Sequence, residues 1–264
     1  LSRMTVPVLF YLSERKKHPV SAAEATPEGG ALAEDTAVTG AALHEPLEPR
    51  EVSRLAREGH LILDVRGPAE FGVAHVPGSI NISLEWEFEE CAEALVEPGT
   101  PIILVADDAE AAGEAAERLA GIGVASVRGF LAGGIYAWEH AGLEFESTRQ
   151  IFARELHKRL KAGASPRLQV IDVRPAREFE RGHVAGSANV SLESLEEFTS
   201  GLGRELDLAV VCAVGHKSST AASLLARSGF RRVENVAGGI AEWIEAGYPL
   251  EEPSASPAVG PAAR

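Results

Sequence analysis

Short apolar runs alternate with longer, helix-like segments along most of this chain. Two of the runs, residues 101–106 and 208–212, are almost wholly aliphatic, which is the pattern of strands buried on both faces. Each is followed by an alanine-rich segment with helical character, at 111–119 and 220–227. Strands that alternate with helices in this way predict an α/β fold, with a parallel sheet covered by helices on both faces.

The same pattern occurs twice along the chain. The Asp-Val-Arg motif at 64–66 returns at 172–174, an offset of 108, and the Gly-Gly motif with its tryptophan, at 132–138, returns at 237–243, an offset of 105. Two similar segments with a small slip predict two copies of one domain. We expect an N-terminal extension and linker, a first domain, a second domain and a disordered tail, at residues 1–45, 46–146, 147–252 and 253–264.

Each copy predicts the same order of elements. A first helix, expected at 49–58 and 150–162, precedes a strand that ends in Asp-Val-Arg. A Gly-Ser-x-Asn strand, a helix, the buried strand and the alanine-rich helix follow, and a last strand leads into a tryptophan-bearing helix. Ligands of such sheets bind beyond the carboxyl ends of the strands, and Cys212 lies at one of these ends.

Cys212 is the first candidate for chemistry. It ends an apolar run, and a short loop and a Ser-Ser-Thr helix start follow it. A helix N-terminus carries partial positive charge and unpaired N–H groups, which stabilise a thiolate. We therefore expect the pKa of the Cys212 thiol to fall and its nucleophilicity to rise. The alternative is a small buried core residue, as most free cysteines are.

The loop after Cys212 contains residue types that suit an anion. Gly215 can adopt backbone angles that other residues avoid. Lys217 supplies the one full positive charge, with a solvated surface lysine as the alternative. His216 either assists anion entry or is simply exposed, and Ser218 is expected to cap the following helix.

The residues around the two Asp-Val-Arg motifs mainly have structural interpretations. Asp172, at the end of the neighbouring strand, either forms hydrogen bonds near the site or pins a loop. We expect Arg174 to pair with Glu178 inside its turn, and Arg66 to pair likewise with Glu70. The histidines of the two copies, His75 and His183, are expected to be structural.

The whole chain has a net charge of −14, and its acidic residues are concentrated in the first half. Residues 1–146 contain 10 Lys+Arg and 25 Asp+Glu, whereas residues 147–252 contain 14 of each. No basic footprint for nucleic acid is present. We interpret the acidic half as a solvated face that aids solubility, and the neutral half would repel an anionic substrate less.

The cysteine count and the hydropathy indicate the compartment. With only Cys91 and Cys212, a disulfide framework is not expected, and a reducing, cytoplasmic location fits best. No apolar run reaches the roughly 18 residues of a membrane-spanning helix. The apolar start at 5–12 is followed by positive charge, the reverse of a signal peptide. Because the chain begins with Leu1, a fragment, a processed product or an alternative start are all open.

Taken together, the motifs resemble a rhodanese (sulfurtransferase) domain. They are Asp-Val-Arg, Glu-Phe, Gly-His-Val-x-Gly-Ser-x-Asn-Val, the Cys-x-x-Gly-x-Lys-Ser loop at 212–218 and the closing Gly-Gly…Trp, and two copies cover 46–252. The resemblance implies two domains, each with a five-stranded parallel sheet between helices, and a cysteine that carries sulfur as a persulfide without metal or organic cofactor. By match of position, Cys212 is the sulfur acceptor. The cradle for the persulfide is Ala213, Val214, Gly215, His216 and Lys217, with Ser218 and Asp172 as further substrate-binding candidates.

Loop length and composition bear on the substrate. Cysteine phosphatases related to this fold have an arginine six positions after the cysteine, whereas Lys217 lies five positions after Cys212. The shorter loop favours a sulfur atom over a phosphate. Ala213 and Val214 stand where some large rhodaneses carry cations, which leaves a persulfide donor or a protein partner open beside thiosulfate.

The first copy lacks the thiol in its loop. Ala106 or Asp107 takes the place of the cysteine, and further acidic side chains follow, so this copy is expected to be a scaffold that carries no sulfur. Cys91 lies among carboxylates, which raise a thiol pKa, and we expect it to be packed and structural. The Asp-Asp loop also resembles proteins in which a metallo-β-lactamase-like persulfide dioxygenase precedes rhodanese domains. The His-x-His-x-Asp-His metal motif of such a domain does not occur in this chain.

The sequence therefore predicts a sulfurtransferase that moves sulfane sulfur through a Cys212 persulfide. The expected donor is thiosulfate or a small anionic persulfide. The expected acceptor is a thiol or a cyanide-like ion, with a protein acceptor as an alternative and neither nucleic acid nor membrane as a partner. Two other functions remain open: a sulfur-carrier or regulatory module of a dioxygenase fusion, and a non-catalytic binding module.

Overall fold

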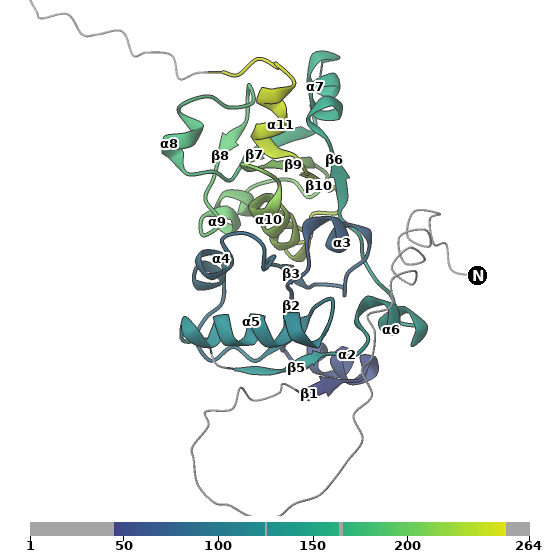
Figure 1. Ribbon diagram of the computed structural model, residues 1–264. Helices are drawn as coiled ribbons and strands as arrows, with labels where there is room; N and C mark the ends of the chain where they lie inside the picture. The colour runs from purple at the N-terminus through teal and green to yellow at the C-terminus, as the bar shows by residue number, and fades with distance from the viewer. Residues whose placement is uncertain (1–44, 125, 164–165, 252–264) are drawn as a thin grey trace, which may run out of the picture. The chain divides into compact units, whose positions relative to one another are not determined.

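The computed structural model describes residues 45–124, 126–163 and 166–251 (Figure 1). These residues belong to one compact unit. The expected tail at 253–264 lies outside the described residues, as does the expected linker except for Glu45.

The first copy contains one sheet of five parallel strands in the order β1-β5-β4-β2-β3. Its elements are β1 (Glu45–Leu47), α2 (Pro49–Arg57), β2 (Leu61–Asp64), α3 (Pro68–Val73), β3 (Ile80–Asn81), α4 (Phe88–Leu95), β4 (Ile102–Val105), α5 (Ala109–Gly121), β5 (Val127–Leu131) and α6 (Gly134–His140).

The second copy repeats this topology, with the strand order β6-β10-β9-β7-β8 and all neighbours parallel. Its elements are β6 (Arg149–Ile151), α7 (Ala153–Lys161), β7 (Leu168–Asp172), α8 (Ala176–Phe179), β8 (Ala188–Asn189), α9 (Leu195–Ser200), β9 (Asp207–Val211), α10 (His216–Arg227), β10 (Val233–Val236) and α11 (Gly239–Glu245). The expected α/β fold with two five-stranded parallel sheets is confirmed, while the exact domain boundaries stay predictions.

The first strand of each copy is absent from the element order that the residue pattern predicts. The helix expected from residue 150 begins at Ala153, and Gln150 lies instead in β6. Strands β1 and β6 are three residues long, too short for a period-2 pattern to appear. Each is held by pairing with the last strand of its copy, a contact between residues far apart in the sequence.

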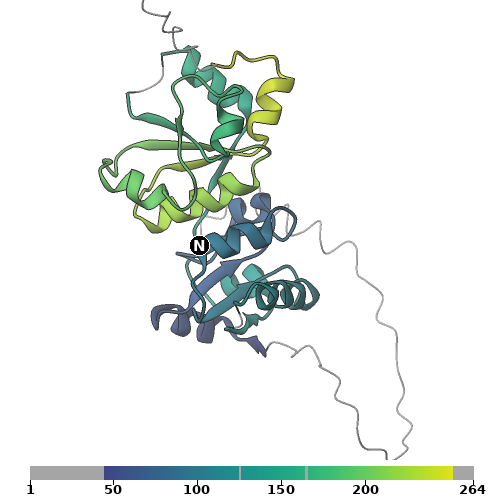
Figure 2. The same cartoon turned by 90° about the vertical axis from the view of Figure 1, so that its left-hand side faces the viewer.

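Alternating side chains of the buried strands enter different cores, as expected for a sheet covered on both faces. In β4, Ile103 and Val105 pack in a cluster with α2 and α6, whereas Ile102 and Leu104 face α4 and α5. The second sheet is covered in the same way: α10 lies along one face, and α7 and α11 lie along the other (Figure 2).

The two copies share one continuous apolar core, to which α4 and α5 contribute from the first copy and α9 and α10 from the second. Polar contacts join α10 to β3 within this interface. The hydroxyl of Ser219 donates to Asn81 Oδ1 at 2.6 Å, and the backbone N–H of Asn81 donates to Ser223 Oγ at 3.1 Å. The helix that begins beside Cys212 is therefore held along its length by the first copy.

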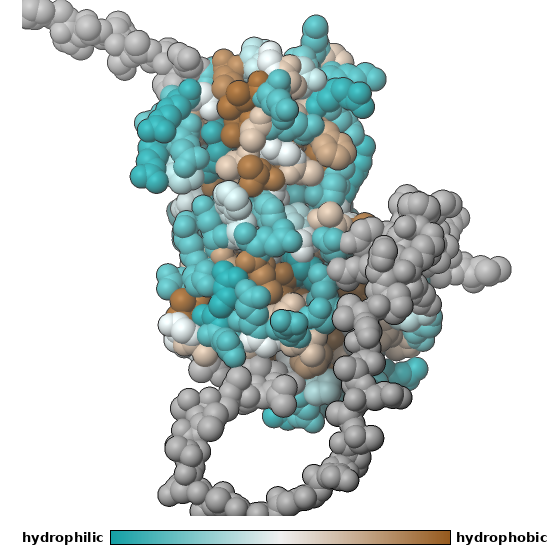
Figure 3. Space-filling model, in the orientation of Figure 1, coloured by the Kyte–Doolittle hydropathy of each residue, from teal (hydrophilic) through white to brown (hydrophobic). Residues whose placement is uncertain are grey.

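The face shown in Figure 3 is mostly hydrophilic, with apolar residues gathered over α11, which contains the exposed Ile244. Within the described parts of the chain, every helix is too short or too polar to cross a membrane.

Replacing Asn81 by alanine is expected to destabilise the protein more than the same change at its counterpart, Asn189. Both amides donate to two backbone carbonyls of their own turn, but only Asn81 also accepts from Ser219 across the interface. Because a buried hydroxyl then loses its partner, Asn81→Ala should lower the free energy of unfolding by about 1–3 kcal/mol more than Asn189→Ala. Urea denaturation of both variants measures the difference, and equal losses would show that the contact adds no stability.

Candidate functional site

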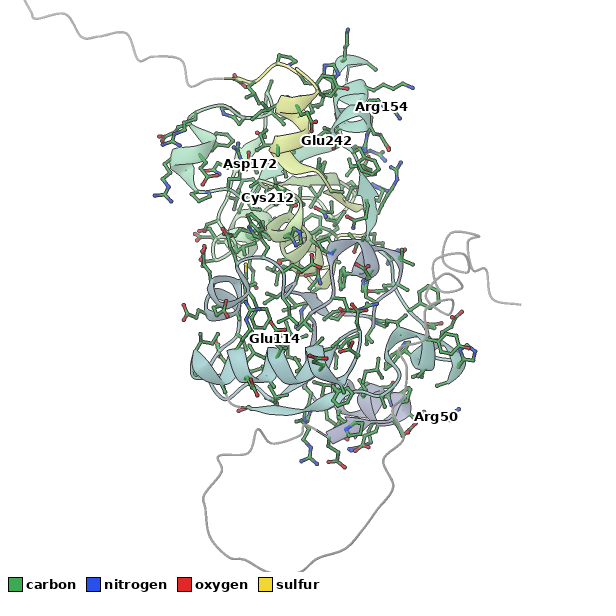
Figure 4. The ribbon with its side chains drawn as sticks, in the orientation of Figure 1. Arg50, Glu114, Arg154, Asp172, Cys212 and Glu242 are labelled. Carbon is green, nitrogen blue, oxygen red and sulfur yellow. The ribbon has the colours of Figure 1, made fainter. Side chains whose placement is uncertain are left out.

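Cys212 is the first residue beyond the carboxyl end of β9. Strand β7 pairs with β9 so that Asp172 lies opposite Val211, which brings both strand ends to the same edge of the sheet (Figure 4). In the first copy, Asp64 lies opposite Val105 in the same way. Ala106, and not Asp107, therefore takes the place of the cysteine.

The sulfur of Cys212 is buried and has two polar neighbours. The side chain is 3% exposed, and Sγ accepts a hydrogen bond of 3.1 Å from the backbone N–H of Gly215. The hydroxyl oxygen of Ser218 lies 3.2 Å from Sγ and 2.6 Å from Asn235 Oδ1. Since this hydroxyl has one proton, it donates either to the sulfur or to the amide oxygen at any moment.

Ser218 is not the helix cap that the sequence predicts. Helix α10 begins at His216, four residues earlier than the alanine-rich pattern indicates, and its cap is Gly215, without a side-chain cap bond. Ser218 lies in the first turn, where its hydroxyl reaches the sulfur. The early start makes the loop after Cys212 only three residues long, so the helix N-terminus lies directly beside the thiol.

Gly215 is required by both its backbone angle and its surroundings. Its φ is +101°, and a Cβ at this position would collide with the backbone carbonyl of Ala237. Asn235, on β10 and fully buried, donates from Nδ2 to the Gly215 carbonyl at 3.0 Å. Sequence reasoning missed Asn235, although a polar residue in the middle of a strand with two valine ends was a usable signal.

Lys217 is paired with the other copy. Its side chain is 13% exposed, so it is not a solvated surface lysine, and Nζ lies 2.8 Å from Glu87 Oε2 and 3.0 Å from Glu90 Oε1. Burial alone would lower the pKa of Lys217, but the hydrogen bonds to both glutamates raise it above its ordinary value. The ammonium group is thus charged, and carboxylates of the first copy, one on α4 and one just before it, contact it.

His216 is half-buried and stacks on Trp86 of the first copy, with ring centroids 6.1 Å apart. Burial lowers its pKa, with a smaller opposing effect of Glu85, so the imidazole is neutral at neutral pH. Among the described residues its Nδ1 is buried without a hydrogen-bond partner. Its position fits neither a simply exposed residue nor a cation that attracts anions.

Asp172 pins its own turn. Its carboxylate accepts from the backbone N–H of Arg174 at 3.0 Å and from the guanidinium Nη2 at 2.7 Å, and both side chains are buried. Arg66 pairs with Asp64 in the first copy. The predicted pair of Arg174 with Glu178 was therefore wrong, because the aspartate that ends the strand is buried at the right place to meet the guanidinium. Arg66 likewise has Asp64 as its main partner, and the charge of Glu70 has a smaller effect on the pKa of Arg66.

The two histidines that occur at matching positions of the repeat have structural partners. The Nδ1 atoms of His75 and His183 lie 2.8 and 3.0 Å from the carbonyl oxygens of Phe71 and Phe179, and each ring stacks on that phenylalanine. Both side chains are buried, and burial lowers the pKa of His75. The expected structural role fits these contacts.

A pocket of about 210 Å³ adjoins the loop at Lys217. Both copies line it: Glu90, Cys91 and Ala94 from α4, and residues that follow β7 and β8 together with Lys217 from the second copy. The described residues hold no group of three or more His, Cys, Asp or Glu side chains placed to bind a metal ion.

The loop of the first copy is closed by its own carboxylate. Only residues 107 and 108 separate Ala106 from α5, one fewer than in the second copy, and the Asp108 side chain accepts from the N–H of Ala111 at 2.9 Å. The helix N-terminus that would face an anion is thus capped internally.

Cys91 is a buried side chain of α4. Burial above all, with smaller effects of Glu87 and Glu90, raises the pKa of its thiol to about 11. Its expected packed position agrees with the structure, although burial contributes more to the pKa than the carboxylates do.

Parts of this chain are similar in sequence to known proteins. The family model described as "Rhodanese-like domain" matches residues 48–141 and 152–246. A thiosulfate sulfurtransferase of Shewanella oneidensis is 35% identical over 79 residues, which are 30% of this chain and 78% of that protein. A putative sulfur carrier protein of Bacillus subtilis is 28% identical over 105 residues. These residues are 40% of this chain and 56% of the Bacillus protein.

Solved structures were also found. A rhodanese-related protein of Thermoplasma volcanium matches with a TM-score of 0.35 and 36% identity, over 39% of this chain and 97% of that one.

Replacing Gly215 by alanine is expected to destabilise the protein strongly. Gly229 provides a matched control, because its φ is +90° but a Cβ there would meet nothing within 4 Å. Gly229→Ala should cost only the backbone strain, about 1–2 kcal/mol. Gly215→Ala adds the collision with the Ala237 carbonyl, for a total of about 3 kcal/mol or more. Urea denaturation compares the two, and similar midpoints would show that the loop can relax.

Proposed function

The chain belongs to the rhodanese-like domain family, and on that premise we propose that it is a sulfurtransferase whose second copy carries sulfane sulfur on Cys212. Relatives named thiosulfate sulfurtransferase and putative sulfur carrier support this class of function. The first copy, with Ala106 in place of the cysteine, acts as a partner of the second and carries no sulfur.

The observation that carries the proposal is the surroundings of the Cys212 sulfur. The Gly215 N–H and the Ser218 hydroxyl approach Sγ at the N-terminus of α10, where an anion is favoured. A thiolate and a terminal persulfide sulfur are both anions, so this arrangement serves the free and the loaded state of the site. The cradle residues Ala213 to Lys217 are proposed substrate-binding residues, and Asp172 supports them indirectly through the turn that it holds.

The reaction needs one nucleophile and no redox partner. The Cys212 thiolate attacks the outer sulfur of thiosulfate, a sulfur–sulfur bond forms, and the bond to the sulfonate sulfur breaks, so that sulfite leaves with the electron pair. Cys212–S–S⁻ remains. An acceptor thiolate or cyanide ion then attacks the terminal sulfur, which releases the Cys212 thiolate and gives a persulfide or thiocyanate. A low-molecular-weight persulfide donates its outer sulfur in the same way, with a thiolate as the leaving group.

The physiological setting belongs to the same proposal. A small sulfur donor and a thiol acceptor are the partners, and a protein thiol is a second class of acceptor. Both cysteines are free in the structure, which suits a reducing, cytoplasmic compartment.

Incubation with thiosulfate or glutathione persulfide is expected to add one sulfur atom, about 32 Da, to the intact protein. Mass spectrometry under non-reducing conditions detects the adduct. It should be absent in Cys212→Ser. It should persist in Cys91→Ser, because a thiol with a pKa of about 11 is scarcely ionised at neutral pH.

An adduct that survives Cys212→Ser would contradict the assignment of the sulfur carrier. No adduct with either donor would favour the alternative of a non-catalytic binding module. Hydrolysis of an aryl phosphate that depends on Cys212 would revive the phosphatase alternative.

A further inference from the structure

The first copy supplies charge to the candidate site of the second. Lys217 is the only lysine or arginine in residues 213–218, and its ammonium group is already contacted by Glu87 and Glu90 at 2.8 and 3.0 Å. An anion that approaches the loop must compete with two carboxylates for one cation. The trio as a whole carries a net negative charge.

In the pocket beside the loop, the second cation is also paired with a carboxylate. Its other cation, Arg174, is bound by the buried carboxylate of Asp172. Glu193 also lines the pocket, and the Ser191 hydroxyl, its own backbone N–H and the nearby charge of Lys217 lower the pKa of its carboxyl, which is therefore ionised at neutral pH.

Two cations of this pocket thus meet four carboxylates: Glu87, Glu90, Asp172 and Glu193. A dianion such as thiosulfate enters a region whose positive charge is already paired with carboxylates, and like charges repel there. A donor that carries an ammonium group beside its persulfide meets no such net repulsion.

We propose that Glu87 and Glu90 of the first copy determine the donor specificity of the Cys212 site: they pair with Lys217, disfavour dianionic donors and favour persulfides of thiols that bear an ammonium group. This inference rests on the proposed sulfurtransferase function. It gives the first copy, which lacks a cysteine in its own loop, a role in selecting the substrate of the second.

The test compares two donors that differ in charge but share the same reacting group. Cysteamine persulfide has an ammonium group, whereas 3-mercaptopropionate persulfide has a carboxylate, and both form from the corresponding disulfide and sulfide. Thiosulfate is the third donor. The rate of Cys212 persulfide formation with each, followed by intact mass, gives kcat/KM for sulfur loading.

The variant Glu87→Gln/Glu90→Gln removes both charges and keeps side-chain size and one acceptor oxygen at each position. We expect the kcat/KM ratio of 3-mercaptopropionate persulfide to cysteamine persulfide to rise about tenfold or more, and that of thiosulfate to cysteamine persulfide to rise likewise. The matched control, Glu93→Gln/Glu97→Gln, makes the same change in net charge in and just after α4, at residues that do not pair with Lys217, and should leave both ratios within about twofold.

A second variant keeps the test valid if the double variant unfolds. Glu90 is 69% exposed, so Glu90→Gln alone should fold and shift both ratios in the same direction by a smaller factor. Unchanged ratios, or equal changes for all three donors, would overturn the specificity role and leave the ion pair as a structural contact. Absence of any adduct with every donor in the unmodified protein would instead overturn the proposed function itself.

Discussion

The candidate site depends on the close packing of Gly215 against the backbone of Ala237. Only a residue without a Cβ fits there, at a φ of +101°. The tight loop that results turns its N–H group toward the Cys212 sulfur, while the Cys212 carbonyl accepts from the N–H of Ile240 at 2.8 Å. A backbone N–H of α11 thus donates to the carbonyl of Cys212, while the N–H of Gly215 donates to the Cys212 sulfur. This packing goes together with the short loop that connects Cys212 to α10.

The two copies combine the same sheet topology with different loops at the strand end. Their sheets have the same strand order, and the strand ends have the same register at Val105 and Val211. What differs is the loop, which is one residue shorter in the first copy and has Ala106, Asp107 and Asp108 where the second copy has Cys212, Ala213, Val214 and Gly215. With Asp108 as its cap, α5 satisfies a backbone donor from within. Helix α10 has Gly215 as its cap, without a side chain that could accept, which leaves a donor for an external or covalently bound anion.

The interface makes the copies interdependent. An apolar core runs from one to the other, and the helix that begins at the loop is tied to β3 through Ser219 and Asn81. At its N-terminal end the same helix meets the carboxylates of the first copy through Lys217. The first copy, which has no cysteine in its loop, therefore contacts both the lysine of the second copy's loop and the helix that follows it, which is more than the scaffold role that its sequence predicts.

Much of the fold and part of the site follow from the sequence alone. The repeat, the buried strands and the strand-end position of Cys212 depend on local patterns, because aliphatic runs and turn residues act over a few neighbouring positions. The three-residue strands β1 and β6 do not follow from such patterns, since only pairing with a distant strand makes them strands.

The same limit applies to the charges of the site. From the sequence, Lys217 is a cation five residues after a cysteine, and Arg174 is expected to pair with Glu178. Only the tertiary structure brings Glu87 and Glu90 to Lys217 and Asp172 to Arg174, because these pairings depend on burial and on the docking of one copy against the other. Local patterns thus indicate which groups can react, whereas the packing of the two copies sets which charges surround them.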